Sequence, residues 1–484
     1  MEQGTSFAVP VGQRQLFLDD YGIAGISGLL RTMHPPAKKG AVIRPNLDRG
    51  ETALQTRSAP AWDPEANVFK LWLITSSTFH SGTTYVESED GLHWRKPALG
   101  QQQVNGSSNN NFVTVDPQLE WPANAMENVL RDADDPDPSR RYKALGHCYG
   151  REPLVSPDGI HWRRLEVPPI PSSDESNLSY DPYTHTFIAT LKDAGGGGRY
   201  GRSAWLSTSA DFQRWTEPRL LFEADDLDQQ LGRGNIEARL ADRTRQPLAY
   251  HDPARYSVQV YNMGLFRYEG LYIGLPTMYH ETGQAPDDHG GFHQVQLVCS
   301  RDLRHWERLG ERRPFLDSSP LGAGAYDLTC IIGPSWPVVR GEELWFYYTG
   351  LKYYGGEVDE RFTRPEFNVL PRDPDKGAIC LAVLRRDGFI SLDAGDRPGT
   401  LLTQPFRLTG KTLFVNVDAA KGALRAEVLD AAGDVVAASE PLEGERTRAQ
   451  VEWRQADLAD LQGEQVSLRF TLRNARFYSY WLEP

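Results

Sequence analysis

The sequence predicts an all-β protein in which a five-bladed β-propeller is followed by a C-terminal β-sandwich. Three features carry this prediction: a turn motif that recurs along the first 390 residues, strand-like runs around each copy, and clean apolar–polar alternation after residue 400. The predicted domains are an N-terminal segment at 1–50, with a strand that closes the propeller, the propeller at 51–397 and the sandwich at 398–484.

The turn motif occurs five times. It reads SEDGLHW at 88–94 and SPDGIHW at 156–162, and it diverges to STSADFQRW at 207–215, CSRDLRHW at 299–306 and RRDGFI at 385–390. The first four copies end in tryptophans at 94, 162, 215 and 306, separated by 68, 53 and 91 residues. Such intervals hold several short strands each, which is typical of propeller blades. Chance recurrence is the alternative, and four copies in register argue against it.

The Asp-Gly copies predict a hairpin turn, because the glycine accepts the positive φ that such turns need. The tryptophan is expected to hold its hairpin against the neighbouring blade. From blade one to blade five, the predicted inner and second strands are 58–62 and 69–75, 128–131 and 141–146, 177–180 and 186–191, 264–267 and 271–276, and 331–339 and 343–349. Residues 15–18 are the predicted closing strand.

Two further segments are assigned from their patterns. Residues 223–250 lack β alternation and are predicted as a short helix or a surface loop. Alternation over 412–417, 424–429, 449–453 and 466–472 predicts strands with one buried face, which form the sandwich.

The composition excludes several classes of partner. A net charge of −13 without a basic block argues against a nucleic acid or an anionic membrane. The four cysteines, at 148, 299, 330 and 380, are scattered and are expected in the core rather than in disulfides or a zinc site. No leader and no membrane-length apolar run is visible, so we expect a cytoplasmic protein, or a secreted one if a leader has been removed.

Ionisable residues concentrate at one end of the predicted blades. An inner strand begins, and its antiparallel neighbour ends, at the same face. The candidate catalytic residues at this face are Asp174, Glu175, Asp327 and Glu127. The candidate substrate-binding residues are Asp20, Arg57, His80, His147, Arg202, Asn262, His280 and Lys352. Turn caps, solvated loop acids and core histidines are the alternative interpretations of these residues.

Paired carboxylates in one pocket suit glycoside hydrolysis, in which one carboxyl protonates the leaving oxygen and the other attacks the anomeric carbon or activates water. Blades three and five are not adjacent, so Asp174 or Glu175 is expected to face Asp327 across the axis, with Glu127 nearby. The chain has no Gly-x-Ser-x-Gly elbow, Walker loop or metal motif. We therefore expect no cofactor and no catalytic metal, and leave a structural calcium ion open.

The predicted architecture resembles the five-bladed propeller glycoside hydrolases of families 32, 43, 68 and 130. The Ser-x-Asp-Gly-x-x-Trp turns and the strands that end in Asp63-Pro64 and Asp181-Pro182 carry this resemblance, and the C-terminal sandwich makes family 32 the most similar. The Asn-Asp-Pro-Asn-Gly and Glu-Cys motifs of family 32 are absent, and its Arg-Asp-Pro motif survives only as Arg131-Asp132. The resemblance implies a glycosidase with an axial pocket, closed by residues 280–292 and 352–367.

Three functions stay open from the sequence. The first is hydrolysis of a furanoside or related glycan end, with a carbohydrate as the substrate. The second is a non-catalytic carbohydrate-binding propeller. The third is a phosphate-dependent glycoside phosphorylase, in which Arg57, Arg202 and Lys352 would hold phosphate. A homo-oligomer is compatible with each of them.

Overall fold

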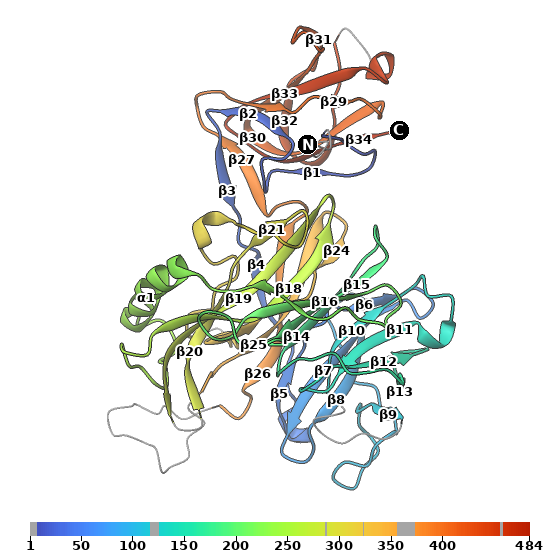
Figure 1. The fold of residues 1–484 in the computed structure, drawn as a ribbon, viewed down its shortest axis with the longest axis vertical. Helices are drawn as coiled ribbons and strands as arrows, with labels where there is room; N and C mark the ends of the chain where they lie inside the picture. Colours follow the sequence, from blue (N-terminus) through green and yellow to red (C-terminus); the bar gives the residue numbers. More distant parts are fainter. Residues whose placement is uncertain (1–6, 117–124, 286–287, 323, 356–372, 455–457) are drawn as a thin grey trace.

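The chain is mostly β in the computed structural model (Figure 1), as the sequence predicts. Residues 7–116, 125–285, 288–322, 324–355, 373–454 and 458–484 are described. Within them the one α-helix is α1 (Asp226–Ala241), in the segment predicted as a helix or a loop. Asp225 and Asp228 form a capping box at its start, the local signal that begins the helix. No helix in these ranges is long and apolar enough to cross a membrane.

Three separate sheets follow the predicted order of strands. The first contains β10 (Met126–Arg131), β11 (Tyr142–Gly146), β12 (Glu152–Ser156) and β13 (His161–Arg164), with β9 (Thr114–Asp116) parallel to β13. The second contains β14 (Ser176–Asp181), β15 (Thr186–Lys192), β16 (Ala204–Ser209) and β17 (Arg219–Phe222). The third contains β18 (Ser257–Tyr268), β19 (Leu271–Ala285), β21 (Val298–Ser300) and β22 (Glu307–Arg308), with β20 (Asp288–Val295) beside β19. Residues 280–292, expected as a loop over the pocket, thus fall largely in the β19–β20 hairpin.

A nine-stranded sheet unites the first and last predicted blades. One part contains β5 (Glu51–Gln55), β6 (Ala61–Asp63), β7 (Val68–Ser77) and β8 (Gly82–Ser88). The other contains β23 (Cys330–Ile332), β24 (Val338–Arg340), β25 (Glu343–Leu351), β26 (Gly377–Arg385) and β4 (Ala37–Ile43). One parallel pair, Gly377 with Ala53, joins the two parts, so the last repeat lies beside the first.

The recurrent motif forms a turn that its own side chains cap. In the second copy Ser156 Oγ accepts the amide of Gly159 at 2.8 Å. Asp158 Oδ1 accepts the amides two and three residues further on, at 2.8 and 2.9 Å. Gly159 has a φ of 82°, and Phe212 and Leu303 hold the same place in the next copies at 62° and 60°. The serine and aspartate therefore preserve the turn where glycine is lost.

The tryptophan of the motif contacts the neighbouring sheet, as predicted. Trp162 Nε1 donates to Gly159 O at 2.8 Å, and Trp72 of β7 donates to the same oxygen at 2.6 Å. The two indole rings meet edge to face with centroids 6.0 Å apart. Trp94 meets Tyr347 of β25 in the same way, also at 6.0 Å. The turn of Trp162 thus packs against the nine-stranded sheet, and the turn of Trp94 packs against the other part of that same sheet.

Gly159→Ala tests this packing. A Cβ at Gly159 would lie 2.4 Å from the Trp72 ring, whereas a Cβ at Gly106, where φ is 74°, meets nothing within 4 Å. Backbone strain alone should cost Gly106→Ala about 1–2 kcal/mol of unfolding free energy. Overpacking should bring the cost of Gly159→Ala to roughly 2–5 kcal/mol. Urea denaturation compares the two variants, and equal losses would contradict the packing role of the turn.

An eleven-stranded sheet lies at the top of Figure 1. Its strands are β1 (Gln15–Leu16), β2 (Ile23–Ser27), β3 (Leu30–Met33), β27 (Ile390–Ala394), β28 (Gly399–Thr403), β29 (Phe406–Arg407), β30 (Thr412–Leu429), β31 (Val435–Ala438), β32 (Leu442–Gln450), β33 (Gln465–Arg473) and β34 (Ala475–Glu483). Short 3-10 turns occur at Leu47–Arg49, Pro138–Arg140, Gly310–Arg312 and Leu458–Leu461.

The closing strand expected at residues 15–18 is wrong. β1 pairs with β34, with Gln15 opposite Tyr480, so it belongs to the eleven-stranded sheet. A strand of two residues has no hydrophobic pattern that could select its partner, which is why the sequence misled. The N-terminal strand that extends the sheet of β25 is instead β4, which pairs with β26.

Asp387, from the fifth copy of the turn motif, ties the eleven-stranded sheet to the sheets below it. Its carboxylate is fully buried and accepts hydrogen bonds from Arg14 Nη1 at 2.5 Å, Tyr268 OH at 2.7 Å and Ser479 Oγ at 2.6 Å. These donors come from the N-terminal segment, from β18 and from β34. The Arg14 guanidinium also lies 3.9 Å from the centroid of the Trp481 ring. The motif aspartate, which caps its own turn in the other copies, here serves an interface.

Asp387→Ala should weaken this interface strongly. The substitution leaves the buried Arg14 guanidinium without its carboxylate, which typically costs about 3–5 kcal/mol. Asp434→Ala, at an exposed turn of the same sheet, is the matched control and should cost less than about 0.5 kcal/mol. Thermal denaturation compares the two variants. An Asp387→Ala midpoint equal to that of the control would show that the carboxylate does not hold the interface.

Candidate functional site

A buried ion pair lies between the first predicted blade and the third. Arg57 sits in the break between β5 and β6, and Glu175 directly precedes β14. Arg57 Nε lies 2.7 Å from Glu175 Oε2, and Nη2 makes a second hydrogen bond to Oε1. Both side chains are almost completely buried, at 4% and 2% exposure. Such a two-point contact fixes both groups, because the planar guanidinium matches the carboxylate.

Asp174 forms the second ion pair. Lys192, the last residue of β15, places Nζ 2.6 Å from Asp174 Oδ2 and 4.1 Å from the centroid of the Tyr261 ring. Burial alone would raise the pKa of Asp174, but the Lys192 ammonium, helped by Arg57, lowers it below its ordinary value. The Asp174 side chain stays half exposed, so it presents an ionised carboxylate to solvent. Arg57, Asp174, Glu175 and Lys192 are called the ion-pair cluster below.

Four rings form an aromatic wall beside the ion-pair cluster: Tyr261 of β18, Tyr279 of β19, His293 of β20 and Tyr354 after β25. The His293 centroid lies 4.4 Å from that of Tyr261, 4.9 Å from Tyr354 and 5.5 Å from Tyr279. Burial raises the pKa of Tyr261 well above its ordinary value, and the charges of Glu175 and Asp174 raise it further. The wall and the cluster therefore act on one another electrostatically.

His293 is a neutral hydrogen-bonding group at neutral pH. Burial lowers its pKa to about 3, and the cations Lys192 and Arg202 lower it too. Its Nδ1 lies 2.9 Å from the carbonyl of Ile331, which can only accept, so Nδ1 carries the proton. Nε2 is then an acceptor, and it is buried without a partner among the described residues.

Two more groups complete this end of the sheets. Arg202 Nη1 donates to Gln259 Oε1 at 2.8 Å, and its guanidinium lies 5.1 Å from the Tyr279 centroid. Cys330 Sγ lies 3.2 Å from His293 Nδ1. Burial raises the pKa of the Cys330 thiol, so it stays protonated and is a poor nucleophile.

His280 lies next to Tyr279 in β19 but does not contribute to the aromatic wall. Successive side chains of a strand point to opposite faces, so His280 points away from the wall that its neighbour Tyr279 helps to form. It stacks on Phe292 at 4.7 Å and approaches Asn235 of α1 at 3.5 Å. Burial lowers its pKa to about 4. Tyr279 was not predicted as a site residue, although the alternation of side chains along the strand would have identified it.

Asn262, the neighbour of Tyr261, takes part in a chain of hydrogen bonds between different sheets. This chain is called the axial network below. Asn262 Nδ2 donates to Asn177 Oδ1 at 3.0 Å, and Asn177 Nδ2 donates to Ser335 Oγ at 3.0 Å. Ser335 Oγ in turn donates to the carbonyl of Arg57 at 2.5 Å. The Asn262 amide group thus has protein partners and joins strands, rather than pointing with Tyr261 into the wall.

His147, His80 and Asp20 contact other parts of the molecule. His147 has a φ of 69°, and its Nδ1 accepts the amide two residues further on at 2.9 Å, so it shapes a turn. His80 packs edge to face on Phe112 at 4.8 Å. Asp20 is exposed and pairs with Arg31 of β3, in the eleven-stranded sheet. Among the described residues, no contact joins His80 or Asp20 to the ion-pair cluster, whereas Arg151 donates to the carbonyls of both His147 and Asp174.

Asp327, predicted to face Asp174 or Glu175 across the axis, is held by a lysine and a tyrosine. Its Oδ2 accepts hydrogen bonds from Lys38 Nζ at 2.7 Å and Tyr348 OH at 2.9 Å, and the side chain is buried. Lys38 belongs to β4, the edge strand that was not expected there. No contact among the described residues joins Asp327 to the ion-pair cluster.

Glu127 and Lys352 flank the site. Glu127 lies at the irregular position of β10, and the next residue, Asn128, donates from Nδ2 to Ser176 Oγ at 2.7 Å. The backbone of Glu127 is therefore next to the loop of the ion-pair cluster, and its side chain lies outside the described part. Lys352 Nζ lies 2.8 Å from each of two carboxylates, at 373 and 375. Most of the loop expected at 352–367 also lies outside the described residues.

No group of three or more His, Cys, Asp or Glu side chains is placed to hold a metal ion, within the part of the chain that the structure describes.

Comparison with known proteins finds similar folds at low sequence identity. No protein-family model and no curated protein matches the sequence. The family 32 β-fructofuranosidase of Bombyx mori is 10% identical, over 92% of this chain and 94% of its own, with a TM-score of 0.42. A family 43 arabinoxylan arabinofuranohydrolase from Bacillus subtilis is 10% identical, over 92% and 99%, at 0.39. A structure from the family 130 mannoside phosphorylases and hydrolases is 12% identical, over 76% and 96%, at 0.40.

Lys192→Met tests the electrostatics of the cluster. Because the pKa of folded Asp174 is lowered, the pair stabilises the fold above the unfolded pKa of about 3.9, and this stabilisation is lost as the pH falls through the folded value. The variant should therefore be destabilised at pH 7, and the difference from wild type should shrink toward pH 3. Urea denaturation at several pH values measures it. In an Asp174→Asn background this pH dependence should vanish, and its persistence there would assign it to another group.

Proposed function

We propose that the four smaller sheets form the five blades of a propeller, with two blades in the nine-stranded sheet, and that the eleven-stranded sheet is a sandwich domain. The repeated four-strand order, and the pair of Ala53 with Gly377 that brings the last sheet beside the first, support a closed ring. Residues 51–397 then supply most of the propeller, with β4 added to blade five. Residues 398–484 supply most of the sandwich, with β1, β2, β3 and β27 added.

We infer that the chain is a glycoside hydrolase whose active site is the ion-pair cluster. The observation that carries this inference is one half-exposed ionised carboxylate, Asp174, beside the buried Arg57–Glu175 pair and the aromatic wall. A sugar presents apolar ring faces that pack on aromatic side chains, and its hydroxyls need a few fixed polar partners. A furanoside or related glycan end is the substrate that the resemblance implies.

The residues divide into roles by their environment. Asp174 is the candidate nucleophile or general base, since its lowered pKa keeps it ionised. Glu175 is a positioning residue that holds the Arg57 guanidinium. Glu127 is the candidate acid, from its place on β10 beside the cluster. The neutral His293, with an acceptor at Nε2, suits a sugar hydroxyl.

Hydrolysis fits the charges better than phosphorolysis. A phosphate needs cations whose charge is not already neutralised. Arg57 and Lys192 have carboxylate partners at 2.7 and 2.6 Å, and Lys352 has two. Arg202 differs, because its described partners are uncharged. We therefore expect turnover that does not depend on phosphate.

A panel of nitrophenyl furanosides and pyranosides, assayed with and without phosphate, tests hydrolysis. On any substrate that is turned over, Asp174→Asn should lower kcat by on the order of 10² or more, because an amide neither attacks nor accepts the proton. Glu127→Gln should lower kcat by a similar factor, because it removes the proton donor. Asp20→Asn, at an exposed carboxylate of the eleven-stranded sheet, is the matched control and should keep the wild-type kcat.

Three outcomes would redirect the proposal. Wild-type rates in both Asp174→Asn and Glu127→Gln would mean that the catalytic carboxylates lie elsewhere. An absolute requirement for phosphate would favour a phosphorylase. Glycan binding without turnover of any substrate would favour a carbohydrate-binding propeller.

A further inference from the structure

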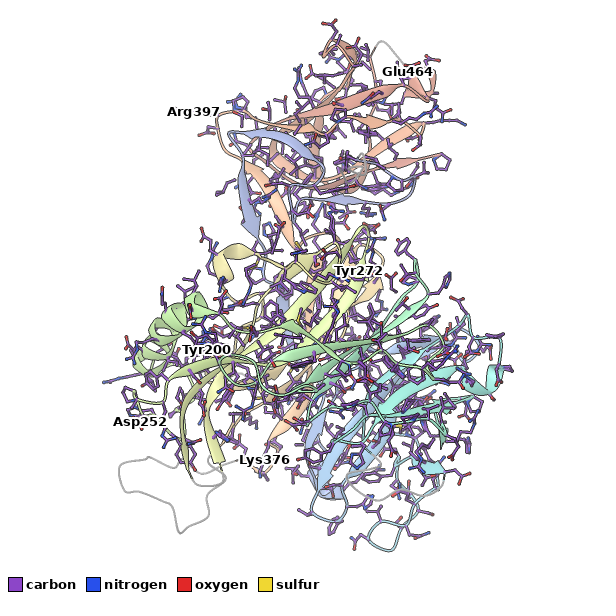
Figure 2. All side chains as sticks on the ribbon, viewed as in Figure 1. Tyr200, Asp252, Tyr272, Lys376, Arg397 and Glu464 are labelled. Carbon is purple, nitrogen blue, oxygen red and sulfur yellow. The ribbon has the colours of Figure 1, made fainter. Side chains whose placement is uncertain are left out.

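A cavity of about 330 Å³ opens at the opposite ends of the inner strands. The ion-pair cluster lies where β14 begins, whereas the cavity is lined where β6, β10, β14 and β18 end and by the segment that leads into β24. In Figure 2, Lys376, which is hydrogen bonded to Lys352, lies at the lower edge. Tyr272, the strand partner of the cavity residue Arg267, lies nearer the eleven-stranded sheet. The two sites are therefore at different ends of the same strands.

Aromatic rings make up much of the cavity wall. Trp62 comes from β6, Tyr180 from β14, Phe266 from β18 and Trp336 from the segment before β24. Trp62 is 39% exposed and Val339, also in the lining, is 49% exposed, so the cavity opens to solvent. Its volume is at the lower end of the range of about 300–1,000 Å³ found for ligand pockets. A ligand of one ring fits this size better than an extended chain.

Arg131 and Arg267 are the charged residues of the cavity lining. Arg131, at the end of β10, has a buried Nε without a hydrogen-bond partner among the described residues. The Arg131 side chain is hydrogen bonded to the hydroxyl of Tyr142, which donates its own proton to Asp63, and Lys70 neutralises that carboxylate at 2.6 Å. Arg267 Nε donates to a backbone carbonyl at 3.1 Å, and its guanidinium lies over a tyrosine ring at 4.7 Å.

Arg131 and Arg267 differ from the arginines that pair with a carboxylate and resemble the buried Arg239, whose described partners are carbonyl and hydroxyl oxygens. Arg14, Arg57 and Arg308 each pair with a carboxylate, at 2.5, 2.7 and 2.7 Å. Within the described residues, neither Arg131 nor Arg267 has such a pair, and none of the described cavity-lining residues is acidic. A guanidinium removed from water is stabilised by a carboxylate that meets its planar fork at two points. The cavity lining thus holds two cations and no carboxylate.

We propose that this cavity is a second binding site, which takes a single sugar ring with a carboxylate, a hexuronate. The Arg131 and Arg267 guanidinium groups bind the carboxylate, and the Trp62 and Trp336 rings pack on the apolar face of the sugar. The site does not depend on catalysis at the ion-pair cluster. It is tested by binding rather than by turnover, so failure of one proposal leaves the other intact.

Isothermal titration calorimetry of the whole chain with sodium glucuronate and sodium galacturonate tests the site. We expect saturable binding that weakens with added salt, because charge pairing near a surface is screened. Glucose, which has the ring without the carboxylate, should bind about tenfold more weakly or not at all, since a charged hydrogen bond is worth about 1.5–3 kcal/mol. Phosphate and benzoate separate recognition of the whole sugar acid from recognition of an anion or of a ring acid.

Matched variants locate the site. Arg131→Gln and Arg267→Gln should each weaken uronate binding by about tenfold. Arg163→Gln, at an exposed arginine of β13, and Asp174→Asn, in the ion-pair cluster, should leave it unchanged. Val339→Trp should block the mouth from an exposed rim position, which keeps the test decisive if either arginine variant fails to fold.

The proposal is overturned if neither uronate binds, or if binding survives both Arg131→Gln and Val339→Trp. Equal affinity for glucose and glucuronate would refute recognition of the carboxylate. Phosphate binding as tightly as the uronates would refute recognition of the sugar ring, and benzoate binding more tightly would replace the sugar acid with an aromatic acid.

Discussion

The packing of the four smaller sheets depends on the axial network, the hydrogen bonds that join Asn262, Asn177, Ser335 and the carbonyl of Arg57. Where inner strands of different sheets meet, backbone and amide groups leave water and must find partners in the protein. The carbonyl of Arg57 accepts from both the amide and the hydroxyl of Ser335, and Ser58 Oγ accepts the amide of Val129 at 2.7 Å. The same residue, Arg57, neutralises Glu175 with its side chain. Arg57 thus takes part in both structures: its backbone joins the sheets, and its side chain forms part of the candidate site.

Much of the fold could be read from the sequence because its signals are local. The turn motif fixes where each sheet bends, and its serine, aspartate and tryptophan act within a few residues and on one neighbouring sheet. Strand limits were less certain. The first inner strand was expected from residue 58 but begins at Glu51, because its break at 56–60 hides the continuity. The pairing of β1 with β34 has no local signal at all.

The candidate site was predicted in part. Asp174, Glu175 and Arg57 were predicted at one end of the strands and lie together in the structure, but the pairing of Arg57 with Glu175 spans 118 positions and no pattern encodes it. His280 and Asn262 were chosen for their polarity, whereas the strand alternation presents Tyr279 and Tyr261 to the site. Asp327 was placed by analogy of position, and no local pattern showed that the edge strand β4 would supply its partner Lys38. Such errors arise from side-chain direction and distant partners rather than from the secondary structure.

The pairing of β1 with β34 has a consequence for synthesis of the chain. Gln15 lies opposite Tyr480, so β1 has no partner until β34 has been synthesised. At about 5–20 residues per second the wait is roughly 25–90 s. During it β2 and β3 also lack β28 and β27, and unpaired strand edges are sites of aggregation. The β1 strand is only two residues long and β3 carries Arg31, features that limit pairing with other chains while the C-terminal strands are still being made.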